Sequence, residues 1–363
     1  MEHLTTPAFL VDRAIVQRNC DRLRQRAIDS ETAFRPHVKT HKTEPIARMQ
    51  HGGHIGPITV STLAEAEYFA DRGFTDITYG FPIAPEKLDR AAALARRIER
   101  LNVLIDSETA LRAIEQHGST FDVFLKVDCG YHRAGVDPNN PDSVRLALAI
   151  ARSESVHFQG LLTHAGHSYN VSTIDEVRRI AAEETASLTR FRALLASEGL
   201  GDLKRSIGST PTLSTTDRFA DTDEVRPGNY VFYDAFQATL GSCKLEDVAV
   251  SVLTTVVGSY PERQQLIVDA GALAMSKDRG PEQIDSEFGY GLVCDLALRP
   301  QPMKLVALSQ EHGKIETAMH VPVGTKLRIL PNHSCLTAAM YDAYHILDER
   351  GVVVDEWKPV RGW

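Results

Sequence analysis

The chain has 363 residues, of which 43% are hydrophobic and 24% are charged, as in ordinary globular proteins. Its formal net charge of −8 disfavours nonspecific binding to nucleic acid, which needs a basic surface. The N-terminus lacks a signal-peptide pattern, and no apolar run reaches the roughly 20 residues of a membrane span. The five cysteines include no CxxC pair. A cytoplasmic protein of about two domains is expected.

Between residues 33 and 240, short apolar strands alternate with amphipathic helices. Strands are expected at 33–38, 57–61, 76–80, 102–107, 121–130, 156–166, 204–210 and 223–234. Helices are expected at about 44–51, 62–73, 85–99, 108–118, 142–153 and 173–199. Thr62 with Glu65 has the pattern of a capping box, and Gly73 that of a C-cap. Eight strands that alternate with helices predict a parallel sheet closed into a TIM-type (β/α)8 barrel.

The pattern changes after residue 240, where strands follow one another without strong helices. These strands are expected within 248–260, 264–271, 303–313, 324–335 and 344–357. Such a run predicts a mainly antiparallel β domain. We therefore expect an α/β chain with a barrel over 1–240 and a β domain over 241–363. Residues 1–10, at the start of the chain, fall in the barrel range but could instead pack with the β domain.

Function in a (β/α)8 barrel is located at the C-terminal ends of the strands. Lys39 follows the first expected strand, and the segments 208–212 and 226–230 follow the last two, where such barrels often bind phosphate. Glycines there let the backbone approach an anion, and Ser209 and Thr210 supply hydroxyl donors. A cofactor that carries both an aldehyde and a phosphate fits this arrangement. Pyridoxal phosphate (PLP) is such a cofactor, and a lysine holds it as a Schiff base.

Seven segments, taken together, resemble the D-serine dehydratase and D-threonine aldolase family. They are "RPHVKTHK", "LKVDCGYHRAG", "HAGHSY", "GSTPT", "RPGNYVFYD", "LSQEHG" and "PNHSC". The resemblance covers about residues 6–357 and implies a PLP enzyme with the alanine-racemase-like fold, PLP fold type III. It further implies that Lys39 carries the cofactor and that Lys42 does not.

The same resemblance implies roles for residues around the cofactor. Arg133 resembles the arginine that contacts the phenolic oxygen, and His164 and Tyr169 would lie around the ring. The phosphate would be held by Ser209, Thr210, Gly228, Asn229 and Tyr230.

The motif "PNHSC" contains a candidate metal site. His333 and Cys335 are two residues apart at the end of an expected strand, so both side chains should point to the same side. Imidazole nitrogen and thiolate sulfur favour Zn²⁺, and two protein ligands leave positions open for water and substrate. In the family that the chain resembles, the dehydratase branch has His-x-Cys here and the aldolase branch has His-x-Asp.

Each candidate also has a simpler interpretation. Lys39 could be a surface lysine, Cys335 a buried apolar side chain, and Arg133 part of a structural salt bridge. The "GSTPT" segment could be an ordinary turn, because all of its residue types form turns. His37 and His41 are expected to be supporting or structural residues.

The parts combine into a mechanism and a leading hypothesis. Lys39 would remove the α-proton of a D-amino acid, the cofactor would take up the electrons, and zinc would assist loss of the β-hydroxyl. We expect a D-serine dehydratase that yields pyruvate and ammonia. The alternatives are a D-threo-3-hydroxyaspartate dehydratase or a D-threonine-type aldolase. A non-catalytic PLP-binding protein is disfavoured by the second domain. A homodimer is expected, with no nucleic-acid or membrane partner.

Overall fold

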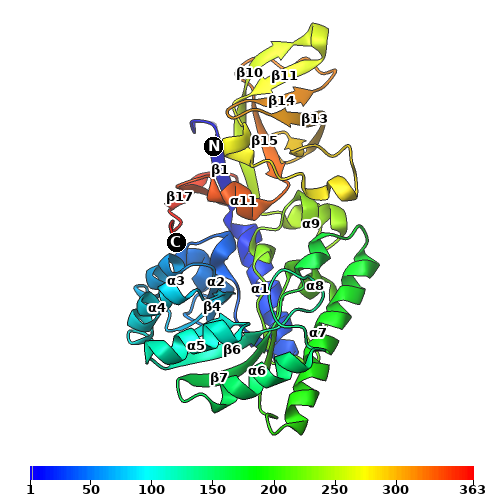
Figure 1. Ribbon diagram of the computed structural model, residues 1–363. Helices are drawn as coiled ribbons and strands as arrows, with labels where there is room; N and C mark the ends of the chain where they lie inside the picture. Colours follow the sequence, from blue (N-terminus) through cyan, green and yellow to red (C-terminus); the bar gives the residue numbers. More distant parts are fainter. Residues whose placement is uncertain (2) are drawn as a thin grey trace. The chain divides into compact units, whose positions relative to one another are not determined.

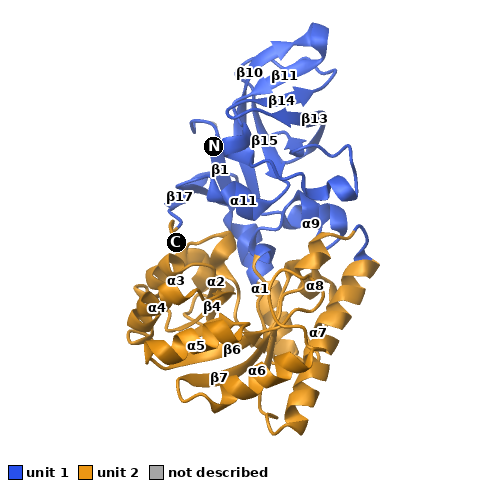
Figure 2. Cartoon of the chain, viewed as in Figure 1, with its two compact units in different colours: residues 1–20, 172–174, 229–359 blue, residues 21–171, 175–228, 360–363 orange. Residues whose placement is uncertain are grey.

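A computed structural model describes residues 1 and 3–363, and its contacts divide the chain into two compact units (Figure 2). Unit 1 comprises residues 1–20, 172–174 and 229–359. Unit 2 comprises residues 21–171, 175–228 and 360–363. Both units are built from segments that are not contiguous in the sequence.

Unit 2 contains a parallel sheet of eight strands, in the spatial order β2-β9-β8-β7-β6-β5-β4-β3. The strands are β2 (Ala33–Phe34), β3 (Ile58–Val60), β4 (Asp76–Pro82), β5 (Arg100–Ile105), β6 (Phe121–Lys126), β7 (Val156–Leu162), β8 (Lys204–Ile207) and β9 (Glu224–Val225). A parallel bridge between His37 and Thr59 joins the segment after β2 to β3, and so links the two edges of the sheet. The predicted barrel fold is confirmed, although β2 and β9 are much shorter than expected.

Helices lie outside this sheet (Figure 1). They are α2 (Glu44–Gln50), α3 (Leu63–Ala70), α4 (Leu88–Ala95), α5 (Glu108–His117), α6 (Pro141–Arg152), α7 (Ile174–Ser197) and α8 (Thr210–Thr215). Thr62 caps α3 as the sequence predicts, because its hydroxyl accepts a hydrogen bond from the backbone N–H of Glu65 at 3.1 Å. The Glu65 carboxylate, however, accepts from the backbone N–H of Ser61 at 2.8 Å instead of that of Thr62, so the predicted capping box is only half formed. Gly118 ends α5 in the left-handed conformation, with φ of 77°. The helix α1 (Arg13–Asp29) precedes β2 and was missed in the sequence.

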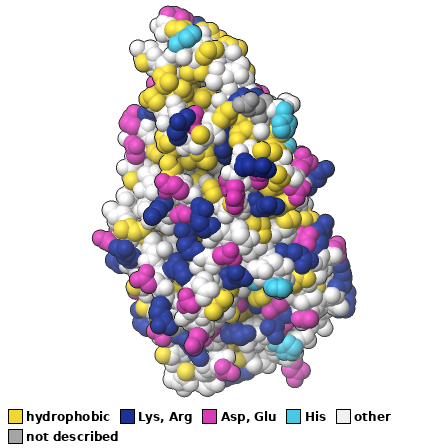
Figure 3. All heavy atoms as spheres, turned by 180° about the vertical axis from the view of Figure 1, so that it is seen from behind, with side chains coloured by type: hydrophobic (Ala, Val, Ile, Leu, Met, Phe, Trp, Pro, Cys, Tyr) yellow, Lys and Arg dark blue, Asp and Glu magenta, His cyan; other side chains and the backbone are white. Residues whose placement is uncertain are grey.

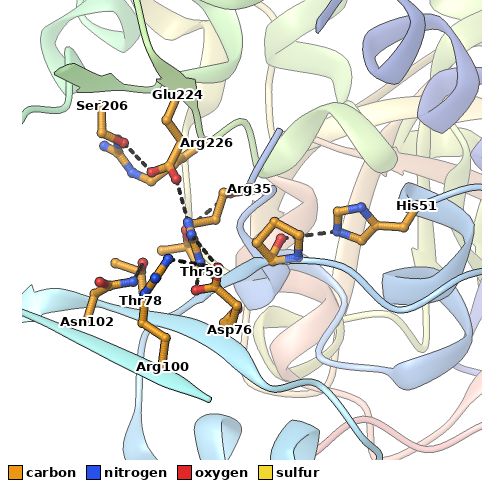
Figure 4. Close-up of polar contacts among 11 residues, drawn as sticks. Arg35, His51, Thr59, Asp76, Thr78, Arg100, Asn102, Ser206, Glu224 and Arg226 are labelled. Carbon is orange, nitrogen blue, oxygen red and sulfur yellow. Dashed lines mark hydrogen bonds and ion pairs between the residues drawn. The ribbon is translucent and has the colours of Figure 1, made fainter. Parts of the chain in front are cut away.

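The interior of the barrel contains a buried charge network rather than only apolar side chains (Figure 4). The guanidinium of Arg35 donates to Glu224 Oε2 at 2.6 Å and to Asp76 Oδ1 at 2.7 Å. Glu224 Oε1 accepts a further hydrogen bond from the Ser206 hydroxyl at 2.6 Å. Burial alone would lower the pKa of Arg35, but its two carboxylate partners outweigh burial and raise that pKa. The network therefore keeps the charges of both partners paired inside the sheet.

Breaking this network should destabilise the barrel strongly. In a Glu224→Gln variant, Arg35 would retain only Asp76 as a carboxylate partner, so we expect a loss of unfolding free energy of up to about 3–5 kcal/mol. The matched control is Glu108→Gln, which removes an exposed pair with Arg112 on α5 and should cost only about 0.3–0.5 kcal/mol. Urea unfolding of both variants measures the difference, and equal losses would contradict the structural role of the buried pair.

Unit 1 contains an antiparallel sheet that closes on itself. The strands β10, β11, β14, β13, β12 and β15 follow one another in space, and β10 pairs with both β11 and β15. Their bounds are β10 (Val250–Tyr260), β11 (Gln265–Val268), β12 (Gly291–Cys294), β13 (Pro300–Leu308), β14 (Gly313–Glu316) and β15 (Lys326–Pro331). The predicted β domain is confirmed as a fold, but β12 and β14 were not predicted.

Three further strands extend this sheet on one side of β10. They are β1 (Ala8–Asp12), β16 (Tyr344–Leu347) and β17 (Val353–Trp357). The strand β1 pairs antiparallel with β10 and parallel with β16, so the start of the chain belongs to the β unit. The short helices of unit 1 are α9 (Ala235–Leu240), α10 (Ala272–Met275) and α11 (Ser334–Ala339).

The local structure predicted for the "PNHSC" motif is wrong. The strand β15 ends at Pro331, His333 is the N-cap of α11, and Cys335 lies within that helix. The alternation of side chains along a strand therefore does not orient this pair. Instead, the turn from strand to helix determines where His333 and Cys335 point.

On the face shown in Figure 3, acidic and basic side chains are intermingled over the middle and lower parts of the view, whereas hydrophobic side chains gather in the upper part. In the part of the chain that the structure describes, no helix is both long enough and apolar enough to cross a membrane.

Candidate active site

Lys39 lies where the barrel sequence predicts functional residues. It is exposed and belongs to a single 3₁₀ turn, η1 (Val38–Thr40), directly after the bridge that closes the sheet. Lys42 is held differently, because its Nζ forms an ion pair with Oε1 of Glu65 at 3.0 Å and the Glu65 side chain is only 1% exposed. The ion pair gives Lys42 a structural function and supports the assignment of the cofactor to Lys39.

Two imidazoles adjoin Lys39 and remain uncharged. Burial, followed by the positive charge of Lys39, holds the pKa values of His37 and His164 well below the usual value. The Nδ1 of His164 contacts the carbonyl oxygen of Gly208, so the proton of the neutral ring lies on Nδ1. The Nε2 of His164 is then a hydrogen-bond acceptor. His41, in contrast, is fully buried, and its Nδ1 accepts from the backbone N–H of Thr43 at 3.1 Å, as expected for a structural residue.

Arg133 is positioned by an aromatic ring that the sequence analysis did not single out. Its guanidinium carbon lies 4.8 Å from the ring centre of Tyr131, which also stacks on His167 at 6.1 Å. A Cβ atom at Gly166 would lie 2.2 Å from this tyrosine ring, so only glycine fits there. Among the described residues, no ion pair includes Arg133, so the structural salt bridge considered as its alternative is not supported.

The hydroxyl groups after β8 form a compact cluster. The Ser209 hydroxyl lies 2.9 Å from that of Ser168 and 2.8 Å from that of Thr212. The Thr210 hydroxyl is buried and finds no hydrogen-bond partner among the described residues. A buried hydroxyl without a partner is costly unless a ligand completes it. This observation fits the predicted phosphate site at Ser209 and Thr210.

A buried carboxylate fixes the loops that follow β7 and β8. Oε1 of Glu184, on α7, accepts hydrogen bonds from the backbone N–H groups of Ala165 at 3.0 Å and Gly208 at 3.2 Å. Oε2 of Glu184 accepts from the Thr212 hydroxyl at 3.1 Å. Burial raises the pKa of Glu184, although these donors oppose the rise. Glu184 was not predicted from the sequence, where its only signal is an acidic side chain on the buried face of a helix.

The other predicted cofactor residues divide between the units. Tyr169 is half-buried and ends the turn η3 (Gly166–Tyr169) in unit 2. Gly228 packs closely on His37, because a Cβ atom there would lie 3.2 Å from the His37 Cβ. Asn229 and Tyr230 are buried in unit 1, in the turn η4 (Asn229–Val231).

Lys126, at the end of β6, is a buried lysine that the sequence analysis did not select. Burial, with the charge of Arg226 as the next cause, lowers its pKa to about 7. An unfolded lysine has a pKa of about 10.4, so between these values the unfolded chain binds one more proton than the native protein. Stability should therefore rise with pH above about 7, by up to roughly 1.4 kcal/mol per pH unit.

Substitution of Lys126 tests this pH dependence. Urea unfolding at pH 7, 8 and 9 should show rising stability for the wild type and a flatter profile for Lys126→Met. Lys204→Met changes an exposed lysine and is the control that should keep the wild-type slope. Parallel pH profiles for the Lys126 variant and the wild type would contradict a lowered pKa.

The candidate metal ligands are brought together in unit 1. The His333 ring has a side-chain hydrogen bond with Cys335, and its Nδ1 lies 2.9 Å from Oδ2 of Asp278. Burial alone would lower the pKa of His333, but the hydrogen bonds to Asp278 and Cys335 outweigh it and raise that pKa well above the usual value. The side-chain amide of Asn229 donates to Cys335 Sγ at 3.6 Å. One imidazole and one thiol in contact match the donor set that Zn²⁺ prefers.

Asn229 therefore contacts the metal motif through its side chain. The same amide donates to the Ser334 hydroxyl at 2.7 Å and to Asp234 Oδ2 at 2.9 Å. Because the side-chain amide is engaged in this way, Asn229 would contact a phosphate through its backbone N–H. Within residues 1 and 3–363 as described, no group of three or more His, Cys, Asp or Glu side chains is arranged to hold a metal. His333 and Cys335 therefore stay the predicted ligands of this site.

Comparisons with known proteins find a family match for the barrel part of the chain and another for the β part. Residues 11–235 match the family model of the alanine racemase N-terminal domain, and residues 249–347 match that of a putative serine dehydratase domain. The D-threo-3-hydroxyaspartate dehydratase of Delftia sp. is 41% identical, over 99% of this chain and 98% of that protein. The solved structure of the Delftia enzyme has a TM-score of 0.93 to this chain. The match covers 100% of this chain and 99% of the Delftia chain.

A second relative and one variant structure complete the comparison. The D-serine dehydratase of Dictyostelium discoideum is 38% identical, over 100% of this chain and 98% of that protein. A cysteine-to-alanine variant of D-threo-3-hydroxyaspartate dehydratase has been solved in a metal-free form, with 40% identity, a TM-score of 0.92 and coverage of 100% of this chain and 99% of that chain. On these grounds the chain belongs to the D-serine dehydratase family of PLP-dependent lyases, which has the alanine-racemase-like fold.

Proposed function

We propose that this protein is a PLP- and zinc-dependent D-serine dehydratase. The observation that carries the proposal is the contact between His333 and Cys335, which would offer a metal one imidazole and one thiolate ligand rather than an imidazole and a carboxylate. Soft sulfur favours Zn²⁺ over the hard divalent cations that prefer oxygen. Full-length similarity to dehydratases of D-serine and D-threo-3-hydroxyaspartate supports the same assignment.

The residues of unit 2 fit PLP. Lys39 would hold the aldehyde carbon, and the buried Thr210 hydroxyl would donate its unused hydrogen bond to the phosphate, next to Ser209. Arg133, with its guanidinium over Tyr131, would contact the phenolic oxygen. When bound, the cofactor supplies an electron sink for the carbanion that forms at the α-carbon.

The proton transfer is assigned to Lys39. Once released from the cofactor, the amine of Lys39 would be the base that takes the α-proton of the bound substrate. His164 is neutral, with its proton on Nδ1 directed at the Gly208 carbonyl, so it would offer Nε2 as an acceptor beside the reacting groups. In this arrangement Lys39 would move the proton, whereas His164 would orient a neighbouring donor.

His333 and Cys335 would hold the metal. Bound zinc supplies Lewis acidity that stabilises the charge on a departing hydroxyl. The overall change for D-serine removes the α-proton and the β-hydroxyl as water, and hydrolysis then releases ammonia and leaves pyruvate. An aldolase would instead break the Cα–Cβ bond, and the thiolate ligand favours the dehydratase.

Product analysis on three substrates tests the proposal. We expect pyruvate and ammonia in equal amounts from D-serine. Oxaloacetate from D-threo-3-hydroxyaspartate at a higher kcat/KM would move the assignment to the second candidate, which the 41% identical relative supports. Glycine and acetaldehyde from D-threonine, without pyruvate from D-serine, would overturn the dehydratase assignment in favour of an aldolase.

A homodimer is part of the proposal. Unit 1 exposes large apolar side chains, among them Leu273 at 52%, Met319 at 42% and Val323 at 62%, which a partner subunit could cover. Light scattering of the active enzyme should give about twice the 40.1 kDa mass of the chain. A fully active monomer at assay concentration would contradict it. The cytoplasmic location expected from the sequence stays a prediction.

A further inference from the structure

The carboxylate of Asp278 is the feature of the metal motif that neither the sequence pattern nor the assigned ligands explain. Asp278 is 55 residues from His333 in the chain, yet its Oδ2 lies 2.9 Å from His333 Nδ1. Its Oδ1 accepts a hydrogen bond from the backbone N–H of Gly280 at 2.7 Å. Both carboxylate oxygens are therefore engaged, and the carboxylate has a defined orientation.

The backbone around Asp278 is also fixed to the segment that precedes α11. The side-chain amide of Asn332 donates to the Asp278 carbonyl oxygen at 3.1 Å and to the Gly289 carbonyl oxygen at 2.9 Å. A Cβ atom at Gly280, where φ is 50°, would lie 2.6 Å from the Cβ of Asn332. This close packing joins the Asp278 turn to the residue directly before His333.

We propose that Asp278 is the positioning residue for His333 as a metal ligand, an inference that rests on the metal assigned under the proposed function. A carboxylate that accepts a hydrogen bond from Nδ1–H keeps the proton of the imidazole on that nitrogen. Nε2 then carries the lone pair that binds a metal, and the hydrogen bond fixes the rotation of the ring. Such a partner also increases the basicity of the ligating nitrogen.

Asp278 is not a third ligand in this arrangement. Its Oδ2 is used by His333 and its Oδ1 by Gly280. The two roles differ in how they respond to substitution. An asparagine at this position retains an amide oxygen that can accept from Nδ1–H, so Asp278→Asn should retain most of the metal affinity if Asp278 only orients the ring. A direct carboxylate ligand would lose as much affinity in Asp278→Asn as in Asp278→Ala.

The experiment measures the zinc dissociation constant of the PLP-loaded enzyme by competition with a chromophoric chelator. We expect Asp278→Ala to bind zinc about 10- to 100-fold more weakly than the wild type, and Asp278→Asn to recover a large part of that loss. Glu282→Gln changes a carboxylate of the same segment that pairs with Arg279 at 2.8 Å, and it should bind zinc like the wild type. A second readout is the visible spectrum of the cobalt-substituted enzyme, which should change in Asp278→Ala because the imidazole ligand is no longer held.

The outcomes separate this inference from the proposed function. A wild type that binds no zinc overturns the proposed metal and the role of Asp278 with it. If the wild type binds zinc and His333→Ala does not, but Asp278→Ala binds within twofold of the wild type, only the role of Asp278 is overturned. Equal losses in Asp278→Asn and Asp278→Ala also overturn the positioning role, in favour of direct ligation. If Asp278→Ala does not fold, the role of Asp278 is judged from the other two variants. The zinc dissociation constant of Asp278→Asn is then compared with that of Glu282→Gln, together with the cobalt spectrum of Asp278→Asn.

Discussion

Lys39→Ala is expected to abolish the covalent attachment of PLP and nearly all activity. Loss of a positioned general base alone typically lowers a rate by about 10²- to 10⁴-fold, and here the same side chain also carries the cofactor. Borohydride reduction followed by peptide mass mapping should place the pyridoxyl group on Lys39 in the wild type. The Lys39→Ala protein should take up no pyridoxyl group at this site.

Lys42 provides the matched control, because it lies three residues away on the same loop. Its ion pair with Glu65 predicts that Lys42→Ala retains the covalent cofactor and loses mainly stability. Recovery of the pyridoxyl label on Lys42 would reverse the roles assigned to the two lysines.

Removal of the metal is expected to separate proton exchange from dehydration. Chelation should leave PLP bound, because Lys39 and the loops at 208–212 and 226–230 are its proposed anchors. Pyruvate release should stop and should return when zinc is added, because hydroxide is a poor leaving group without a Lewis acid. Exchange of the α-proton of D-serine for deuterium should survive, because Lys39 performs that step. Both rates are measured side by side on chelated enzyme.

Substitution of the thiolate ligand should reproduce the effect of chelation. Cys335→Ala leaves His333 as the one assigned protein ligand, so we expect the metal and pyruvate release to be lost together. Cys294→Ala is the control in the same unit, since burial raises the pKa of Cys294 to about 11 and its thiol packs in β12. Undiminished pyruvate release from a demonstrably metal-free protein would remove the role given to His333 and Cys335.

The barrel could be predicted because its signals are local. Strand-to-helix alternation and a capping residue such as Thr62 act over a few residues, and α2, α3, α5, α6 and α7 begin within one residue of the expected positions. The helix α4 begins at Leu88, three residues after its expected start, because a 3₁₀ turn occupies 85–87. The strands β12 and β14 have four residues each and were missed, because so short a segment contains too few residues to show the alternation of a strand. The turn at His333 was taken for a strand because an apolar strand leads directly into it.

Within the site, residues that carry their own chemistry were visible in the sequence, and residues that hold them in place were not. Lys39 and the His-x-Cys pair stand out as unusual residues in short motifs. Glu184 and Asp278 act through hydrogen bonds to residues 19 to 55 positions away. No pattern in the neighbouring sequence indicates which distant residue either carboxylate contacts. Asn229 was assigned to the phosphate, whereas its side chain contacts the metal motif.

The division of the chain has a consequence for how its chemistry could have been inherited. The lysine, the buried hydroxyls and the neutral imidazoles lie within the segment that matches alanine racemases, whereas the His-x-Cys pair lies in the segment that matches serine dehydratases. On the proposed roles, deprotonation of the amino acid and choice of the bond that breaks would be encoded in separate stretches of the gene. A lineage could change the second by substitutions within 249–347 alone and keep the first intact.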